Sequence, residues 1–302
     1  MSLFVALSLI ASVAYGTSDF FGGLAARRLN VLHSTAGTYV AGTIVVGLGV
    51  VGMGVLGIGG EWTMDATALG AVAGVLAIVG FVCFYAALAI GPMSLLSPAI
   101  ALVGAVVPVG VAAATGAKLD ALAWGAIALA VLATVLISVP SSRTRERVSP
   151  RGAILALIAG LGLGLSIVAI DATDATSGLI PAFVEMVTGV VVLAVLLTAL
   201  RVTRARFGFL AIFEPPPAAS RQRSSARHAW VNAAVAGVLL GVANALILLA
   251  LHAGNLAVVS VLVSLYPLAT VVLAALVLKE RLTLVQVAGI VLAILACVTL
   301  AS

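Results

Sequence analysis

Charged side chains are scarce in this sequence. They make up 8% of its 302 residues, whereas about a quarter of the residues of a soluble globular domain are charged. Hydrophobic residues make up 63%, and the mean hydropathy is +1.31. A soluble chain of this length could not bury so much apolar surface. The composition therefore excludes a soluble protein and predicts one compact, all-helical membrane domain.

Cysteine is also rare, because only Cys83 and Cys297 occur, each inside an apolar run. Such residues are typical of small buried side chains and predict neither a disulfide framework nor a metal site. The sequence contains no P-loop, no HExxH and no GxSxG motif. The glycine-rich stretch 160–166 lies inside an apolar run rather than after a strand. We therefore expect no dinucleotide, no other cofactor and no direct use of ATP.

What the sequence does contain is a series of apolar runs, each about 20 residues long, as a bilayer-spanning helix requires. Ten runs are expected to be helical: 2–20, 32–58, 66–90, 93–115, 119–139, 151–171, 179–200, 229–252, 255–278 and 282–301. Two joints between runs are very short, Gly91-Pro92 and Gly254-Asn255. Both joints predict tight antiparallel hairpins.

The stretch AVAGVL occurs twice, at 71–76 and at 234–239. The same offset of 163, carried from 71–137 onto 234–300, gives 21 identities in 67 pairs, against roughly 8 expected from composition. The first two runs match the sixth and seventh more weakly, at an offset near 148 that pairs Gly16 with Gly164 and Ser18 with Ser166. We predict two repeats of five helices, residues 1–140 and 141–302. Because five is odd, the second repeat is inverted, which is typical of secondary transporters.

The basic residues are distributed unevenly between the connections. Fourteen of the 15 Lys and Arg residues fall in odd-numbered connections, six of them in the long loop 201–228, and only Lys118 falls in an even-numbered one. The acidic residues Glu61, Asp65, Asp171 and Asp174 share the side of Lys118. The positive-inside rule then predicts a multi-pass plasma-membrane protein with cytoplasmic odd-numbered loops and both termini outside. Topology, rather than binding to nucleic acid, explains the net charge of +5.

The end of each half carries a recognisable pattern. In the second half, SLYPLATVVLAALVLKERLTLVQVAGIVLAILACVTL (264–300) places Pro267 before Lys279-Glu280-Arg281-Leu282 and then Gly289. The first half keeps a degraded copy around Pro108 and Lys118-Leu119, without the glutamate. Together with the start YGTSDFFGGLAARR (15–28), these motifs resemble the EamA family of the drug/metabolite transporter superfamily. The resemblance covers essentially the whole chain and is specific for the fold rather than for the substrate.

The resemblance implies a secondary transporter with a central cavity walled by the first, third, fourth, sixth, eighth and ninth helices. Intramembrane ionisable residues are the first candidates, because a charge at the bilayer centre costs several kcal/mol. Asp19 is a proton-coupling or substrate-amine site, or else an interfacial carboxylate paired with Arg27 or Arg28. Glu185 either faces the cavity or extends outward. Asp171 and Asp174 are expected to cap a helix end. His252 is a further cavity candidate, which could titrate near neutral pH, or else a plain histidine at the membrane interface.

Neutral polar residues form a second set of candidates. Substrate contacts are predicted for Tyr85, Ser97, Asn244, Ser260 and Ser264, although a helix–helix hydrogen bond explains any one of them equally well. Three prolines are predicted to kink helices and free carbonyl groups beside the cavity: Pro98, Pro108 and Pro267. Paired glycines are interpreted as close-packing stripes between helices: Gly70 with Gly74, Gly160 with Gly164, and Gly237 with Gly241.

The leading hypothesis is a transporter, not an enzyme, that moves an amino acid, an amine or a similar small amphipathic solute, most simply as efflux. Protons are a candidate coupling ion, and the protein is expected to be a monomer or a homodimer within membrane lipid. The alternative is a flippase of the same fold that acts on a lipid or lipid-linked head group. An intramembrane enzyme fits less well, because the acidic residues fall at different depths and form no convergent set.

Overall fold

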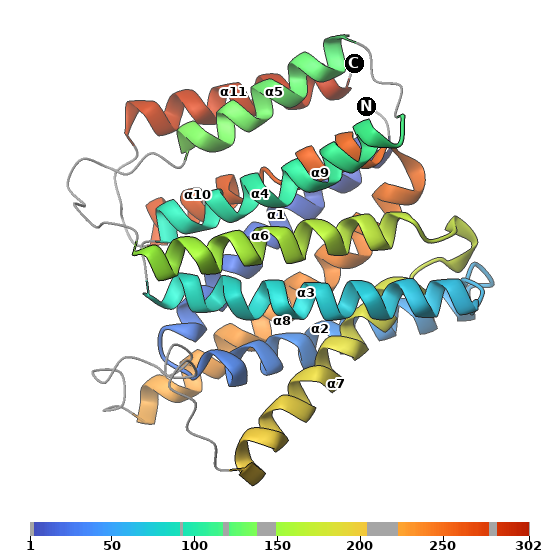
Figure 1. Cartoon of the computed structure of the whole chain (residues 1–302), viewed down its shortest axis with the longest axis vertical. Helices are drawn as coiled ribbons and strands as arrows, with labels where there is room; N and C mark the ends of the chain where they lie inside the picture. Colours follow the sequence, from blue (N-terminus) through green and yellow to red (C-terminus); the bar gives the residue numbers. More distant parts are fainter. Residues whose placement is uncertain are drawn as a thin grey trace.

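A computed structural model describes residues 3–90, 93–116, 121–137, 149–203, 223–277 and 283–301, and helices are the only regular elements in those ranges (Figure 1). The α-helices are α1 Leu3–Ala26, α2 Val31–Val55, α3 Met64–Ile90, α4 Met93–Ala114, α5 Ala121–Ile137, α6 Pro150–Asp171, α7 Ile180–Thr203, α8 Arg223–Ala253, α9 Leu256–Val263, α10 Pro267–Val277 and α11 Leu284–Ala301. A short 3₁₀ helix, η1 Ala175–Ser177, lies between α6 and α7.

Seven segments are long and apolar enough to cross a membrane: α1, α2, α3, α6, α7, α8 and the combined segment Leu256–Val277. Three further apolar helices, within α4, α5 and α11, are shorter. A multi-pass membrane protein is therefore confirmed, whereas the count of ten spans stays a prediction. Several predicted features lie outside the described residues: Gly91-Pro92, Lys118, the arginines at 143–147 and 204–221, and Lys279–Leu282.

The predicted continuous helix at 255–278 is wrong in one respect, because it is interrupted between α9 and α10. The last N–H groups before the break, those of Leu265 and Tyr266, bond to carbonyls three residues back at 3.3 and 3.0 Å. Pro267 has no N–H to continue the ladder, and it begins α10, a position that proline favours. By contrast, α4 runs through both Pro98 and Pro108 as one helix.

The first helix is longer than predicted, and this changes the position of Asp19. It continues to Ala26 rather than stopping at residue 20, because FGGLAA (21–26) contains no proline or charge that would end it. The following helix starts at Asn30, whose side chain accepts a hydrogen bond from the Leu32 N–H at 3.0 Å. Asp19 therefore lies about 10 Å inside the helix end, at 1.5 Å per residue.

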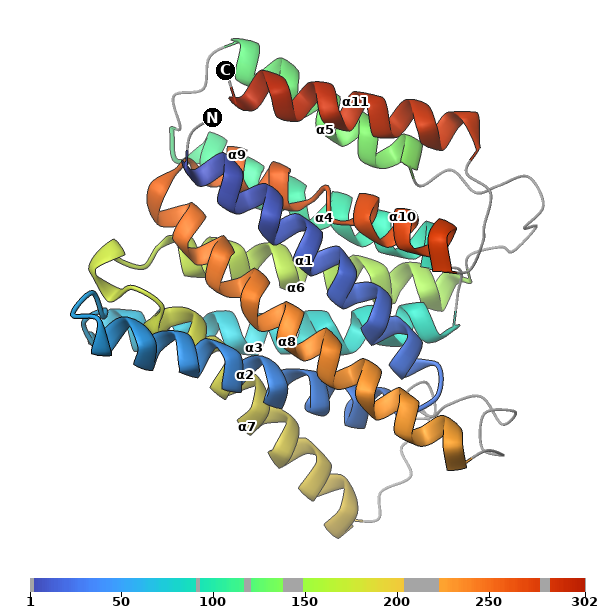
Figure 2. The same cartoon turned by 180° about the vertical axis from the view of Figure 1, so that it is seen from behind.

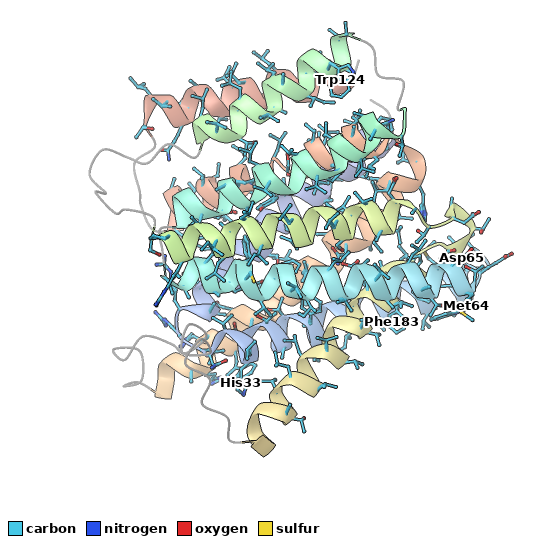
Figure 3. The ribbon with its side chains drawn as sticks, in the orientation of Figure 1. His33, Met64, Asp65, Trp124 and Phe183 are labelled. Atoms are coloured by element: carbon cyan, nitrogen blue, oxygen red, sulfur yellow. The ribbon has the colours of Figure 1, made fainter. Side chains whose placement is uncertain are left out.

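Most helices run between the same two sides of the bundle (Figures 1 and 2). One side holds the end of α1 with Arg27 and the beginnings of α2, α6 and α8, and we call it the Arg27 face. The opposite side holds the α2–α3 connection and η1, and we call it the Trp62 face. In Figure 3, His33 lies toward the first side, whereas Met64, Asp65 and Trp124 lie toward the second.

Helices from the two sequence halves pack against each other. The most extensive contacts join α1 with α8, α3 with α6, α2 with α8, α4 with α6 and α3 with α7, while α5 and α11 form a pair at one edge (Figures 1 and 2). The predicted glycine stripes are confirmed at these contacts. A Cβ on Gly74 of α3 would lie 2.6 Å from the Glu185 carbonyl of α7, and one on Gly237 of α8 would overlap the Thr38 carbonyl of α2.

Two connections also meet at the Trp62 face. The N–H of Glu61, between α2 and α3, donates to the Thr176 carbonyl of η1 at 2.9 Å. Gly60 lies so close to the Ser177 carbonyl that any side chain there would overlap it. Asp174 begins η1 and accepts hydrogen bonds from the Thr176 N–H and hydroxyl, both at 2.8 Å. Asp174 therefore caps η1 rather than the end of α6.

Candidate functional site

A cavity of about 660 Å³, counting space continuous with the outside, lies among α1, α3, α4, α6, α7, α8 and α9. Its lining runs from the middle of α1 and α4 to Ile170, one residue before α6 ends, so it occupies the half of the bundle nearer the Trp62 face. Most of the lining is aliphatic or aromatic. The polar residues in the lining are Tyr15, Ser166, Glu185, Asn244, Ser260, Ser264 and Tyr266.

Glu185 contributes the carboxyl group of this cavity. It lies five residues into α7, is 6% exposed, and accepts a hydrogen bond from the Ser166 hydroxyl on α6 at 3.3 Å. No Lys, Arg or His is among the residues that line the cavity. A carboxyl in an apolar site needs a proton or a cationic partner to offset its desolvation. The cavity is therefore suited to a solute that brings a cationic or hydrogen-bond-donating group.

The neutral polar candidates differ in how free their side chains are. The Ser264 hydroxyl donates to the Val261 carbonyl at 2.7 Å, which satisfies one carbonyl at the α9–α10 break. The Asn244 amide reaches only the Met186 sulfur, at 3.9 Å, which is a weak acceptor. The Ser260 hydroxyl has no hydrogen-bond partner among the described residues. Ser260 and Asn244 therefore retain hydrogen-bonding capacity for a solute.

Three aromatic side chains close the cavity toward the Arg27 face, and we call them the aromatic floor: Tyr15, Phe81 and Tyr266. The ring centroid of Tyr15 lies 5.9 Å from that of Phe81 and 5.1 Å from that of Tyr266. The Tyr266 hydroxyl donates to the Ser97 carbonyl of α4 at 3.4 Å. Further rings follow on α3, since Phe81 contacts both Phe84 and Tyr85.

Asp19 and Tyr85 lie one helical turn beyond this floor, Asp19 after Tyr15 and Tyr85 after Phe81. Neither lines the cavity. Asp19 is 0% exposed, and its carboxyl oxygens make no hydrogen bond within the described part of the chain. The interfacial pairing of Asp19 with Arg27 or Arg28 is wrong, because α1 continues past Asp19 and both arginines are exposed.

Two other candidates, Tyr85 and Ser97, are buried away from the cavity. Neither hydroxyl has a hydrogen-bond partner among the described residues. The hydroxyl of Tyr39, a residue that the sequence did not single out, also lacks a partner among them. Tyr39 packs edge-on against Phe81, with ring centroids 5.6 Å apart. These polar groups form a second region between the aromatic floor and the Arg27 face.

His252 lies at the other end of the site. It is half-buried near the end of α8, and its Nε2 lies 3.1 Å from the Thr173 hydroxyl. That hydroxyl already donates to the Ile170 carbonyl at 2.7 Å, so Nε2 is the donor to Thr173. Asp171 ends α6, and neither it nor His252 lines the cavity. His252 therefore joins α8 to α6 at the Trp62 face.

Comparison with known families identifies the protein class. The model of the EamA-like transporter family matches residues 150–302, about half of the chain. The chain belongs to the EamA-like transporter family. This family is part of the drug/metabolite transporter superfamily, whose members are multi-pass membrane transporters of small molecules rather than enzymes.

No curated protein sequence matches this family member. One crystal structure of a protein superposes on it with a TM-score of 0.70 at 13% sequence identity, and covers 99% of this chain and 98% of the other. At that identity the likeness shows the fold alone.

Sequence reasoning missed several residues that line the cavity. Tyr15, Phe81 and Tyr266 form the floor, and Ser166 binds Glu185. A signal for Ser166 was present, because it is the repeat counterpart of Ser18. No cluster of three or more metal-ligating side chains occurs in the described ranges.

Proposed function

We propose that this EamA-family protein is a secondary transporter of a small amphipathic solute, an amino acid or an amine, which it exports across the plasma membrane. The observation that carries the proposal is the cavity with a single buried carboxyl, Glu185, inside a membrane-spanning helical bundle. Ligand sites of this kind are mostly apolar, with a few placed polar groups, and the lining has that character.

Alternating access between two inverted halves, residues 1–140 and 141–302, is the proposed mechanism. The lining supports it, because several pairs of equivalent positions both face the cavity. At the offset of 163, Phe81 pairs with Asn244, Ile100 with Val263 and Ala101 with Ser264; at 148, Tyr15 pairs with Leu163. Such pairing is expected of a cavity placed on the axis that relates two inverted repeats.

The solute class follows from the chemistry of the lining. Glu185 attracts an ammonium group, and Asn244 and Ser260 have unused hydrogen-bonding capacity. The aromatic floor offers ring faces, which also attract cations. The absence of Lys and Arg from the lining argues against a phosphorylated solute. An amine, or an amino acid bound through its ammonium group, satisfies these features best.

Orientation and coupling complete the proposal. The arginines described in the structure at the ends of α1, α6, α7 and α8 lie toward the Arg27 face, which we assign to the cytoplasm. The cavity then lies in the outer half of the bundle. Protons are the proposed coupling ion, since Asp19 and Glu185 are the two carboxyls buried among the described helices.

The test is a transport screen with purified protein in liposomes, using labelled L-phenylalanine, labelled choline and fluorescent phospholipid, with and without a pH gradient. We expect movement of an amino acid or amine. Glu185→Gln is expected to lower kcat/KM by about 10- to 150-fold, because hydrogen bonds to a charged group contribute about 1.5–3 kcal/mol. Asp65→Asn, an exposed acid at the Trp62 face, is the matched control and is expected to leave transport unchanged.

Two results would contradict the proposal. If the protein moves phospholipid between leaflets but neither solute, it is a flippase of the same fold. If Glu185→Gln and Asp65→Asn behave alike, the cavity carboxyl does not contact the solute.

A further inference from the structure

Asp19 is enclosed by two close approaches on its own helix, one turn before it and one turn after it. At Gly16, the Tyr266 carbonyl lies so near that a Cβ would overlap it, and the Gly16 carbonyl accepts a hydrogen bond from Thr270 on α10 at 2.9 Å. At Gly22, the Tyr85 hydroxyl rests against the backbone in the same way. The carboxyl between these contacts makes no hydrogen bond to any residue that the structure describes, and it is not among the cavity-lining groups.

The repeat places Asp19 in a specific relation to the cavity. At the offset of 148 that pairs Tyr15 with Leu163 and Ser18 with Ser166, Asp19 pairs with Ile167. Ile167 lines the cavity, as do Leu163 and Ser166. When two inverted repeats exchange conformations, each residue takes the environment that its counterpart had. Asp19 would then line a cavity open to the Arg27 face, and Ile167 would be enclosed.

We propose that Asp19 is a proton site separate from the solute site at Glu185: its carboxyl holds a proton while enclosed, and exchanges that proton with water when the cavity opens to the Arg27 face. This rests on the proposed function. The two carboxyls differ in their surroundings. Glu185 borders the cavity, whereas Asp19 lies outside its lining, between the Tyr266 contact at Gly16 and the Tyr85 contact at Gly22. The ligand small enough for such a site is a proton, transferred between the carboxyl oxygen and water.

Among the described residues, no fixed positive charge lies beside Asp19 to hold the carboxylate ionised. Tyr15 of α1, Tyr85 of α3 and Tyr266 of the α9–α10 link lie within electrostatic range of it. From α2, Tyr39 lies near Tyr85. The described parts of α9 and α10 carry no ionisable side chain, and the ionisable residues described in α8 lie toward its ends, at Arg227, His228 and His252. Neutralisation therefore falls to a proton.

The first experiment needs no solute. Infrared difference spectra between pH values, recorded on protein in lipid, are expected to contain the carbonyl band of a protonated carboxylic acid. This band is expected to be lost in Asp19→Asn and retained in Asp65→Asn, and to exchange in heavy water as Asp19 becomes exposed. If Asp19→Asn and wild type give the same difference spectrum, the assignment is overturned, whatever the protein transports.

The second experiment separates the proton site from transport, with L-phenylalanine and choline as probes in liposomes. We expect the rate of wild-type exchange at equal concentrations to depend on the pH at the Arg27 face, and exchange by Asp19→Asn to continue without that dependence. An unchanged pH dependence in Asp19→Asn would overturn the proton site. Absence of any transport by the wild type would instead count against the proposed function, and the infrared result would still decide the proton site.

Discussion

Glu185 and Asp19 are two buried carboxyls of one bundle, and they lie on opposite sides of the aromatic floor. Glu185 accepts a hydrogen bond from Ser166 and borders about 660 Å³ of space. Asp19 has no donor within the described residues and is not among the residues that line this cavity. Both are almost fully buried, at 6% and 0% exposure. Burial alone therefore does not distinguish a solute site from other roles; the free volume and the donors beside the carboxyl do.

The largest effect on stability is expected from a substitution that disturbs the packing around Asp19. In Gly16→Ala the new methyl group overlaps the Tyr266 carbonyl, which is backbone and has little freedom to move. We expect the free energy of unfolding to fall by about 3 kcal/mol or more, a large fraction of the stability of a typical domain. Gly110→Ala is the control, since no described atom lies within 4 Å of its Cβ position. Thermal unfolding in detergent compares the two, and equal midpoints would show that the contact is not constrained.

A smaller loss of stability is expected from a substitution beside Glu185. In Gly74→Ala the methyl group lies 2.6 Å from the Glu185 carbonyl and 2.6 Å from Thr188 Cβ, so α3 and α7 must separate slightly. We expect destabilisation of about 1–3 kcal/mol and weaker transport, because the helix that carries Glu185 moves. Asp19 is unaffected, so its infrared band should persist. Loss of that band in Gly74→Ala would mean that the two sides are not independent.

Ser97 and Ser260 occupy equivalent positions in the two repeats. Substituting each one compares the region around Asp19 with the cavity around Glu185. Both hydroxyls lack partners among the described residues, but only Ser260 lines the cavity. Ser260→Ala is expected to raise KM for the transported solute by up to about 10-fold, the value of one hydrogen bond. Ser97→Ala should leave KM unchanged. Equal effects in transport assays would contradict the placement of the solute.

The smallest effect is expected at the Trp62 face, where the Thr176 N–H and hydroxyl hold the pKa of Asp174 below its usual value of 3.8. A lowered pKa stabilises the folded state above that usual value, and the contribution is lost as pH falls through the lower value. Because Asp174 is exposed, only local loosening of η1 is expected. Hydrogen exchange of the Thr176 N–H should accelerate below pH 3.8, and Asp174→Asn should abolish the pH dependence.

The existence of the helices was predictable from the sequence because each needs a long apolar run, although α1 extends past its run and the run 255–278 forms two helices. The enclosed environment of Asp19 was not predictable in the same way. Its environment depends on where α1 ends and on which atoms of α3 and α10 approach Gly16 and Gly22, and these contacts leave no local pattern. The break at 264–266 was also missed, since a proline is compatible with a kinked helix as well as with a new helix start.

The cavity-lining residues were only partly predictable from the sequence, because their positions also depend on contacts between helices. Glu185, Asn244, Ser260 and Ser264 line the cavity, whereas Tyr85, Ser97 and His252 do not. Polarity within an apolar helix identifies residues that avoid lipid, but it does not say which neighbouring helix they face. Tyr15 and Phe81 were missed because aromatic residues are also common in lipid-facing and core positions.

The α9–α10 break has a consequence for the resting protein. Pro267, which follows the break and begins α10, pairs at the offset of 163 with Gly104, in the middle of the unbroken α4. If the halves exchange conformations, as proposed, the glycine side must bend and the proline side must straighten, and these two changes differ in free energy. Each 1.4 kcal/mol of that difference shifts the populations of the two orientations about tenfold. Under the proposed alternating access, the protein therefore has a preferred resting orientation, even with no solute and no gradient.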